Sequence, residues 1–370
     1  MEVAQNKLKK SEIGLIPEDW ELKAISEITK IFVGRDLNES NFSSQPDDNY
    51  KYPAFSNTVL NAGLYGYYNV PEYNGHSLTV VGRGVGLGTA FVRKGAYGAI
   101  GRLLVLFPKG NVDARYLAAY INNRVKIFTE SGGIPQLTGA SLGKYLIPVP
   151  NAVTEQTAIA TALSDIDTLI ENLEKLIAKK RNIKQGVMQE LLKPKSNWIL
   201  TSVDEVAKIC KGEQLNKDTL AAQGEYPVMN GGIQPSGYSE KWNQNPNTII
   251  ISEGGNSCGY VNFIKTRFWQ GGHCYLVDAK IHKHFLYHLL KFHEKEIMGL
   301  RVGSGLPNIQ RNRLIEFSLS IPDRENQHKI ASVLDGINEE ITTMEHKLHK
   351  YRMIKQGMMQ TLLTGKIRLI

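Results

Sequence analysis

The sequence has little cysteine and no long apolar run. Its three cysteines, Cys210, Cys258 and Cys274, are an odd number without CxxC spacing, so neither a disulfide framework nor a structural zinc site is predicted. Nothing approaches the roughly 20 apolar residues of a membrane-spanning helix, and the polar segment 1–10 has no apolar run behind it. These absences predict a cytoplasmic protein with buried, reduced thiols.

Signatures of catalysis are also missing. The glycine-rich segment Gly82–Gly88 does not fit GxGxxG, and no GxxxxGK[ST] occurs in the chain. Asn245-Pro246-Asn247 is not the Asn/Asp-Pro-Pro-aromatic motif of amino-group DNA methyltransferases. Four histidines cluster without a pattern that would complete a metal site, which favours a solvent-facing helix; they are His282, His284, His288 and His293. We therefore predict no catalytic residue, no metal ligand and no cofactor bound by this chain.

The composition is that of a folded protein with a moderate positive charge. At 370 residues the chain is long enough for two or more cores, and 42% hydrophobic and 22% charged residues are ordinary values. A net charge of +8 favours a polyanionic partner, but many other proteins share it. The distribution says more, because residues 73–112 contain no acidic residue. This stretch predicts one positive face; its basic residues are Arg83, Arg93, Lys94, Arg102 and Lys109.

An internal duplication organises the chain. A shift of 171 positions aligns residues 156–192 with residues 327–363 without a gap, and 17 of the 37 pairs are identical. Other segments correspond more loosely, such as Trp20-Glu-Leu with Trp198-Ile-Leu and Gly133-Ile-Pro-Gln-Leu with Gly305-Leu-Pro-Asn-Ile. The chain is therefore read as unit, helix, unit, helix.

Both copies of the repeat have apolar residues at alternating steps of four and three, which is typical of a helical a/d seam. They are Ile159, Leu163, Ile166, Ile170, Leu173 and Ile177, and in the second copy Ile330, Leu334, Ile337, Ile341, Met344 and Leu348. The seam is expected to resume at Ile183, Val187 and Leu191, and at Ile354, Met358 and Leu362. Each helix needs a partner, so we predict that the two pair antiparallel. A helix from Thr154 to Leu192 would be about 58 Å long, which suits a spacer.

Glycine interrupts each helical pattern once, at the equivalent positions Gly186 and Gly357. Glycine in a helix costs about 1 kcal/mol relative to alanine. Two interpretations stay open: a tolerated weak spot, or a close approach of another helix or a bend.

We predict an α+β fold with a pseudo-two-fold internal repeat. The expected segments are 1–150 for the first mixed unit, 151–195 for the first helical spacer, 196–322 for the second unit and 323–370 for the second spacer. Within the units, strands are expected at 77–81, 99–107, 248–251 and 274–277, and helices at 114–128 and 282–297.

Candidate DNA contacts follow from charge and hydrogen-bonding chemistry. Arginine can bind guanine through two hydrogen bonds, asparagine can bind adenine, and lysine mainly attracts phosphate. In the first unit the candidates are Arg83, Arg93, Lys94 and Arg102, with a polar and aromatic loop of Ser56, Asn57, Tyr65, Tyr67 and Tyr68. In the second unit they are Asn230, Gln234, Asn256, Tyr260, Asn262, Lys265, Arg267, Arg311 and Arg313. For any single residue, an ordinary solvated or buried side chain is an equally good interpretation.

The chain resembles the specificity subunits of type I restriction-modification systems over essentially its full length. The resemblance rests on the opening Ser11-Glu-Ile-Gly-Leu-Ile-Pro-Glu-Asp-Trp20 and the Gln-x-x-Ile-Ala patterns at 156–160 and 327–331. The repeated Ile-Lys-Gln-Gly-x-Met-Gln, beginning at Ile183 and Ile354, adds to it.

This resemblance implies two target-recognition domains and an antiparallel coiled coil. Each domain would read half of a bipartite DNA sequence, and the helices would dock two modification subunits that use S-adenosylmethionine to methylate adenine at N6. Restriction subunits would add ATP- and magnesium-dependent translocation and cleavage. Two alternatives stay open: a methyltransferase or nuclease with unrecognised motifs, and a structural coiled-coil scaffold without sequence preference.

Overall fold

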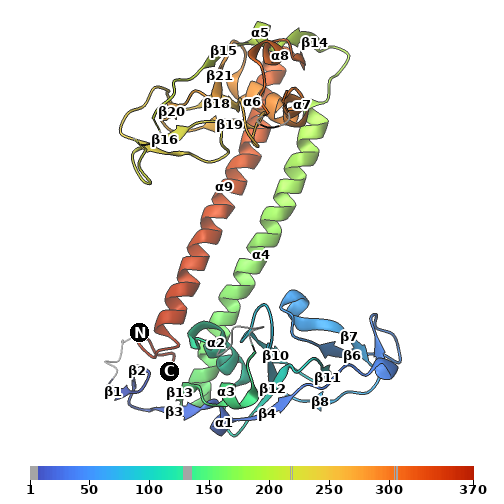
Figure 1. Cartoon of the computed structure of the whole chain (residues 1–370), viewed down its shortest axis with the longest axis vertical. Helices are drawn as coiled ribbons and strands as arrows, with labels where there is room; N and C mark the ends of the chain where they lie inside the picture. Colours follow the sequence, from blue (N-terminus) through green and yellow to red (C-terminus); the bar gives the residue numbers. More distant parts are fainter. Residues whose placement is uncertain (1–6, 128–135, 217, 219, 304, 306) are drawn as a thin grey trace. The chain divides into compact units, whose positions relative to one another are not determined.

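The computed structural model describes residues 7–127, 136–216, 218, 220–303, 305 and 307–370. Its contacts divide the chain into two compact units, unit 1 (residues 1–173 and 347–370) and unit 2 (residues 174–346). Each unit mixes helices and strands, so the predicted α+β class is confirmed (Figure 1). Residues 128 and 133–135, which the sequence assigned to a helix end and to a repeated motif, lie outside the described residues.

Unit 1 is built from two sheets and two short strand pairs. A four-stranded sheet has the order β10-β9-β12-β4, and a five-stranded sheet has the order β5-β7-β6-β11-β8. The bounds are β1 Leu8–Ser11, β2 Gly14–Pro17, β3 Trp20–Ala24, α1 Ile25–Ile28, β4 Thr29–Val33, β5 Phe42–Ser43, β6 Tyr52–Phe55, β7 Leu64–Tyr68, β8 Tyr73–Asn74, β9 Ser77–Val80, β10 Ala90–Arg93, β11 Ala96–Ala99, β12 Leu104–Pro108, α2 Ala114–Arg124, α3 Gly139–Gly143 and β13 Leu146–Pro150.

Unit 2 repeats this plan. Its four-stranded sheet has the order β15-β21-β18-β19, and a smaller sheet has the order β17-β16-β20. The bounds are β14 Ile199–Ser202, α5 Val203–Val206, β15 Ala207–Lys211, β16 Tyr226–Met229, β17 Gly237–Ser239, β18 Thr248–Ser252, β19 Val261–Ile264, β20 Trp269–Gln270, β21 Cys274–Ala279, α6 Lys283–Phe292, α7 Glu294–Gly299, α8 Arg311–Ile315 and β22 Ser318–Ile321.

The two four-stranded sheets share topology and register. In unit 1, β12 pairs with β9 so that Leu104 faces Val80; in unit 2, β21 pairs with β18 so that Tyr275 faces Ile251. Both pairs are related by the same 171 positions that relate the helices. The duplication therefore extends through the sheets, although few residues there are identical.

Two sequence predictions about strands are wrong in part. The strand expected over 99–107 is broken, because β11 ends at Ala99 and a turn at Gly101–Arg102 precedes β12. Tyr65, Tyr67 and Tyr68 lie on strand β7 rather than in a loop. The β-propensity of tyrosine explains the second error.

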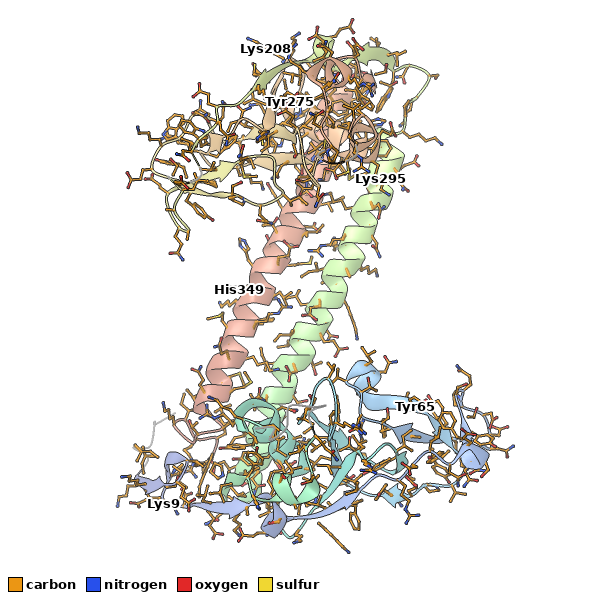
Figure 2. All side chains as sticks on the ribbon, in the orientation of Figure 1. Lys9, Tyr65, Lys208, Tyr275, Lys295 and His349 are labelled. Atoms are coloured by element: carbon orange, nitrogen blue, oxygen red, sulfur yellow. The ribbon has the colours of Figure 1, made fainter. Side chains whose placement is uncertain are left out.

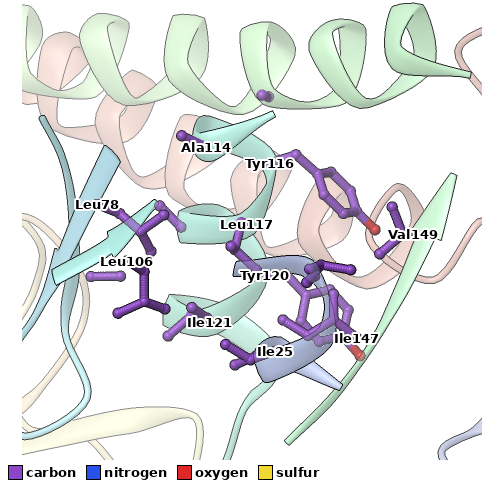
Figure 3. Close-up of a cluster of buried hydrophobic side chains, with 14 of the residues drawn as sticks. Ile25, Leu78, Leu106, Ala114, Tyr116, Leu117, Tyr120, Ile121, Ile147 and Val149 are labelled. Carbon is purple, nitrogen blue, oxygen red and sulfur yellow. The ribbon is translucent and has the colours of Figure 1, made fainter. Parts of the chain in front are cut away.

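Each unit has its own hydrophobic core, formed where helix α2 in unit 1 and helix α6 in unit 2 pack on the four-stranded sheet. In unit 1, Tyr116, Leu117 and Ile121 of α2 meet Leu78 and Leu106 of the sheet (Figure 3). The corresponding core of unit 2 contains Phe285, Leu286 and Leu289 of α6. A tryptophan makes an edge-to-face contact with each helix: Trp20 with Tyr116, and Trp198 with Phe285.

The long helices are α4, Val153–Leu192, and α9, Arg324–Thr361. In unit 1, Ile159 and Leu163 pack in one core with Leu362 and Leu363, and in unit 2, Ile330 and Leu334 share a core with Leu192. In each unit the beginning of one helix thus lies beside the end of the other, so the predicted antiparallel pairing is confirmed. Ion pairs between the helices add to it, linking Asp167 to Lys355 at 2.6 Å in unit 1, and Lys180 to Glu340 and Arg181 to Glu345 in unit 2.

The repeated glutamine at the start of each long helix has a structural role. Gln156 donates from Nε2 to the carbonyl oxygen of Pro150 at 2.8 Å, and its Oε1 accepts from the N–H of Asp113 at 2.8 Å. In the same way, Gln327 donates from Nε2 to the carbonyl oxygen of Pro322 at 2.9 Å, and its Oε1 accepts from the N–H of His282 at 3.2 Å. Because Asp113 and His282 cap the helices α2 and α6, one buried amide fixes each short helix to a long one.

Two expectations about the long helices are corrected in part on the same helix faces. An added Cβ at Gly186 or Gly357 would meet no described atom within 4 Å. The interpretation that another helix of this chain approaches these glycines closely is therefore wrong. The predicted seam misses Ile183 and Ile354, whose side chains are 43% and 41% exposed. It does resume at the other predicted positions, Val187, Leu191, Met358 and Leu362, which pack in the cores of the two units. An isoleucine and a glycine one turn apart therefore form an open face on each helix.

The cysteines are free thiols, with Cys258 and Cys274 buried and Cys210 partly buried. Burial raises the pKa of Cys274 to about 11, which keeps this thiol protonated and unreactive at neutral pH. Among the described residues, no helix combines the length and apolarity that crossing a membrane would require.

Candidate nucleic-acid interface

Two of the predicted arginines lie together in unit 1. Arg83 and Arg102 line a cavity of about 410 Å³, which Gln136 and Arg35 also line. Arg35 lies two residues after the end of β4 and was missed because it lies outside the acid-free stretch. All three arginines are exposed, and none has an ion pair with a residue that the structure describes. The cavity therefore presents three guanidinium groups available to an anionic or hydrogen-bonding ligand.

Arg93 is not available for DNA contact. It is 7% exposed; its Nε donates to Thr79 at 2.9 Å, and its Nη2 donates to the carbonyl oxygen of Ala62 at 2.6 Å. The guanidinium carbon lies 3.5 Å from the ring centroid of Phe55. Burial lowers the pKa of Arg93 to about 10. The inclusion of Arg93 among the candidate contacts is therefore corrected: this arginine holds unit 1 together.

The other first-unit candidates are spread over several elements. Lys94 is exposed but lines a different cavity, with His76 and Arg115. Tyr65 is 54% exposed on β7 (Figure 2) and Tyr67 is partly buried, whereas Tyr68 is 2% exposed. Ser56 lies in the turn after β6, where its N–H donates to the carbonyl oxygen of Gly63 at 2.8 Å.

Several second-unit candidates are engaged by neighbours within the unit. The ammonium of Lys291 lies 3.8 Å from the ring centroid of Tyr260, and the guanidinium of Arg267 lies 4.5 Å from the ring centroid of Trp242. Asn262 accepts from the N–H of Phe263 at 2.9 Å. Arg311 donates from Nε to the carbonyl oxygen of Ile209 at 3.2 Å.

The remaining second-unit candidates are exposed. Gln234, Asn256 and Arg313 are exposed, and Asn256 lies in a glycine-rich turn. Lys265 lines a cavity of about 770 Å³ formed with residues of α4, α6 and α9, among them Lys184. The structure thus brings together fewer of the second-unit candidates than of the first.

A glycine-rich turn recurs in the two units, which sequence reasoning missed. Residues 82–88 and 253–259 have the same shape: Gly84 and Gly255 have φ of 82° and 76°, and Gly88 and Gly259 have φ of 84° and 89°. A side chain at Gly88 would collide with Ile127, and one at Gly259 with Met298. All these pairs obey the 171-residue shift, so applying that shift to the units would have found the turn.

The recurrent turn has a carboxylate in unit 2. Glu253 corresponds to Gly82 and its side chain is 13% exposed. Its Oε1 accepts from Lys211 at 2.8 Å and from the Tyr275 hydroxyl at 3.1 Å, while its Oε2 lies 3.8 Å from Nδ1 of His273. In unit 1, the cavity beside this turn is lined by three arginines and Asp36, whereas in unit 2 Glu253 lies beside Lys211 and His273.

The four histidines do not face solvent as a group, which corrects the prediction. His282 caps α6, and His284 and His288 contact the two carboxylate oxygens of Asp335 at 2.6 and 2.8 Å. His288 is only 1% exposed. Among the described residues, no three histidine, cysteine, aspartate or glutamate side chains are placed so that they could hold a metal ion.

The chain matches one family in sequence and in fold. The family model described as the type I restriction modification DNA specificity domain matches residues 17–180 and 195–350. A putative type I specificity subunit of Mycoplasma genitalium is 32% identical over 153 residues, and the match covers 40% of this chain and 40% of that protein. A second, from Mycoplasma pneumoniae, is 30% identical over 178 residues, with 47% of each chain covered. The matched part thus spans less than half the length of these two relatives.

Longer but weaker similarities cover nearly the whole chain. A type I restriction enzyme specificity subunit of Methanocaldococcus jannaschii is 24% identical over 405 residues, covering 95% of this chain and 94% of that protein. The crystal structure of a type I restriction-modification system S subunit from M. genitalium superimposes with a TM-score of 0.74 at 18% identity, covering 96% and 98% of the two chains. The similarity in fold therefore extends over nearly the whole chain.

Proposed function

This chain belongs to the type I restriction-modification DNA specificity family, and from that membership we propose that it is a specificity subunit that reads a split, asymmetric DNA site. Each unit would read one half of the site, and the bases between the halves would go unread. The chain itself would catalyse neither methylation nor cleavage.

One observation carries the proposal: the same sheet is built twice, with different residues at the same place beside it. In unit 1 this place has Gly82 and Arg102, and in unit 2 it has Glu253 and His273. Two readers of different sequences require such divergence on a shared framework, and Arg102 and His273 are exposed in their units. A plain scaffold would need no such difference.

In unit 1, we propose that Arg35, Arg83 and Arg102 contact DNA, with Tyr65 and Tyr67 on the neighbouring sheet. In unit 2, the exposed residues Gln234, Asn256 and Arg313 are the corresponding proposals. Asn57 and Asn230 are better explained as residues that hold the backbone. Six candidates stay outside the proposed set because each is engaged elsewhere or lines another cavity: Lys94, Tyr260, Asn262, Lys265, Arg267 and Arg311.

We propose that the long helices dock two modification subunits, one on each open helix face. The face in unit 2 contains Ile183 and Gly186, and the face in unit 1 contains Ile354 and Gly357. Exposed isoleucines are unfavourable in water, and the adjacent glycines leave room for a partner's backbone or side chain. Because the two faces share the sequence Ile-Lys-Gln-Gly, two copies of one partner would fit.

The chemistry is proposed to reside in the partners. S-adenosylmethionine would bind the modification subunits, and ATP and magnesium would bind restriction subunits in the larger assembly. This chain would supply sequence recognition and the surfaces on which those subunits assemble.

Reconstitution tests the proposal. Purified chain, modification subunits and their mixture are incubated with labelled S-adenosylmethionine and genomic DNA, and methylated adenines are mapped by sequencing. We expect methylation only in the mixture, at one split motif. Methyl transfer by the chain alone would identify it as an enzyme, and methylation by the mixture without any motif would identify it as a scaffold.

A further inference from the structure

We propose that one turn in each unit reads a DNA base. In unit 1 it is the turn that leads into β12, where Arg102 recognises guanine, and in unit 2 it is the turn that leads into β21, where His273 is the counterpart. This inference rests on the proposed function and adds a specificity-determining residue to it for each half-site.

The two turns occupy the same place in the fold. Each follows a strand that pairs parallel with its neighbour, β11 with β6 and β20 with β16, and each leads into the strand β12 or β21. A hydrogen bond closes each turn, from the N–H of Leu103 to the carbonyl of Ile100 at 3.3 Å and from Cys274 to Gly271 at 3.2 Å. The shift of 171 positions relates Arg102 to His273.

Each turn lies beside the glycine-rich turn of its unit. In unit 1, Gly82, Arg83, Arg102 and Gln136 line the same cavity, and the backbones of Arg83 and Gln136 form a bridge. In unit 2, the backbones of Gly254 and Asn308 form the equivalent bridge. Three backbone segments thus meet at one place in both units. In unit 1 they line a cavity that a base edge or phosphate can approach.

Arg102 has an unfavourable backbone conformation. Its φ is +64° and that of Gly101 is +67°. Positive φ suits glycine but strains a residue with a Cβ. The guanidinium of Arg102 forms no hydrogen bond or ion pair with a residue that the structure describes. Among the described residues, the Arg102 guanidinium therefore makes no polar contact that would stabilise the folded unit. This is expected of a side chain whose role is to contact a ligand.

Asparagine amides hold the two turns in position. Asn57 accepts from the N–H of Gly82 at 2.8 Å, and its Nδ2 donates to the carbonyl oxygen of Gly101. Asn230 accepts from the N–H of His273 at 3.3 Å. Asn57 thereby fixes the arginine turn against the glycine-rich turn. Base recognition needs this rigidity, because a bidentate contact tolerates little displacement.

The chemistry of the two positions differs in a way that suits an asymmetric site. The arginine side chain has only donors, and its fork matches O6 and N7 of guanine. His273 is 63% exposed, and Nδ1 lies 3.8 Å from Oε2 of Glu253. A neutral imidazole has one donor and one acceptor. The two turns therefore favour different bases. Their backbones differ as well, because Gly101 and Arg102 have positive φ whereas Gly272 and His273 do not.

The test exchanges the two side chains within the reconstituted complex with modification subunits. Complexes with Arg102→His, His273→Arg and both substitutions select duplexes from a randomised pool, and the enriched sequences are compared with those of the wild type. We expect Arg102→His to lower the preference for guanine about tenfold at one position of one half-site. His273→Arg should create a guanine preference in the other half-site. Arg124→His, on the exposed end of α2 and outside the cavity, is the matched control and should select the wild-type site.

Arg102→Gly separates recognition from folding. Glycine relieves the positive φ, so the melting temperature should not fall, while the guanine preference should be lost. Unchanged half-sites in Arg102→His and Arg102→Gly, alongside a normal split site for the wild type, would overturn this inference alone. A wild-type complex that selects no split site would overturn the proposed function and this inference with it.

Discussion

At the scale of single residues, a buried carboxylate joins the two ends of the chain in unit 1. Glu155 is 2% exposed and accepts from the indole N–H of Trp20 at 3.2 Å. Arg368 pairs with Glu155 and also with Asp19 at 2.6 and 2.8 Å. Residues near both termini therefore depend on one carboxylate at the start of α4.

Arg368→Ala should destabilise unit 1 by about 3 kcal/mol, because it leaves the buried charge of Glu155 without a cationic partner. Chemical denaturation measures this loss. The matched control is the double variant Arg368→Ala with Glu155→Gln, which removes the charge as well and should recover part of the stability. An equal loss in single and double variants would show that the charge is not the cause.

A buried histidine should make unit 2 sensitive to acid. His288 lies 2.8 Å from Asp335, yet burial lowers its pKa below 6.5, with Lys184 and His284 acting in the same direction and Asp335 opposing them. Between the folded and unfolded pKa values the unfolded chain binds more protons, so stability is full above about pH 6.5 and falls as the pH is lowered.

Denaturation of wild type and His288→Gln from about pH 7 to pH 5 checks this prediction. The wild type should lose stability towards low pH, and the slope should be smaller in His288→Gln. His284→Gln, which alters the other, more exposed contact of Asp335, should keep most of the wild-type slope. Identical slopes in all three proteins would contradict the assignment.

Single contacts were the least predictable part from the sequence. Arg93 and Arg102 lie nine positions apart in the same acid-free stretch, yet one is buried against Phe55 and the other is exposed on a strained turn. Charge and residue type are the same, and only the register of β10 and the turn after β11 separate them. Sequence reasoning had no means to know either.

At the scale of elements, the long helices were predictable because their heptads repeat, and Gln156 and Gln327 mark their beginnings. The open faces at Ile183 and Ile354 were not predicted, since an apolar residue at a helical spacing favours a buried seam. Two isoleucines that stay exposed at equivalent positions are better explained by a partner than by the fold.

Substitutions at the helix glycines test the docking faces. Gly186→Ala and Gly357→Ala should each raise stability by about 1 kcal/mol, since no described atom lies near the added methyl group. Gly186→Leu and Gly357→Leu should each reduce the number of bound modification subunits from two to one, and the double variant should bind none. Analytical ultracentrifugation of the mixtures measures the stoichiometry.

Gly336→Leu is the matched control, because Gly336 also lies in α9 with no described atom within 4 Å of an added Cβ but is not repeated in α4. It should still bind two subunits. Two bound subunits in the Gly186→Leu, Gly357→Leu double variant would place the docking surface elsewhere.

At the scale of the whole molecule, the sequence predicted the repeat, the fold class and the pairing of the helices. It did not predict that the same 171-residue shift extends through the sheets, because residues such as Gly82 and Glu253 share a backbone position and not a chemistry. The segment bounds at 150, 195 and 322 stay predictions, since the contact units divide both long helices between them.

The most direct test of the account lengthens both long helices together. Three heptads inserted in each helix add about 32 Å, close to one turn of duplex DNA at ~34 Å, which keeps the second half-site on the same face. Wild-type and lengthened complexes with modification subunits select duplexes from a randomised pool. We predict the same two half-sites in both, with about one helical turn more of unread sequence between them in the lengthened complex. A single uninterrupted motif, or half-sites that change with helix length, would contradict the account.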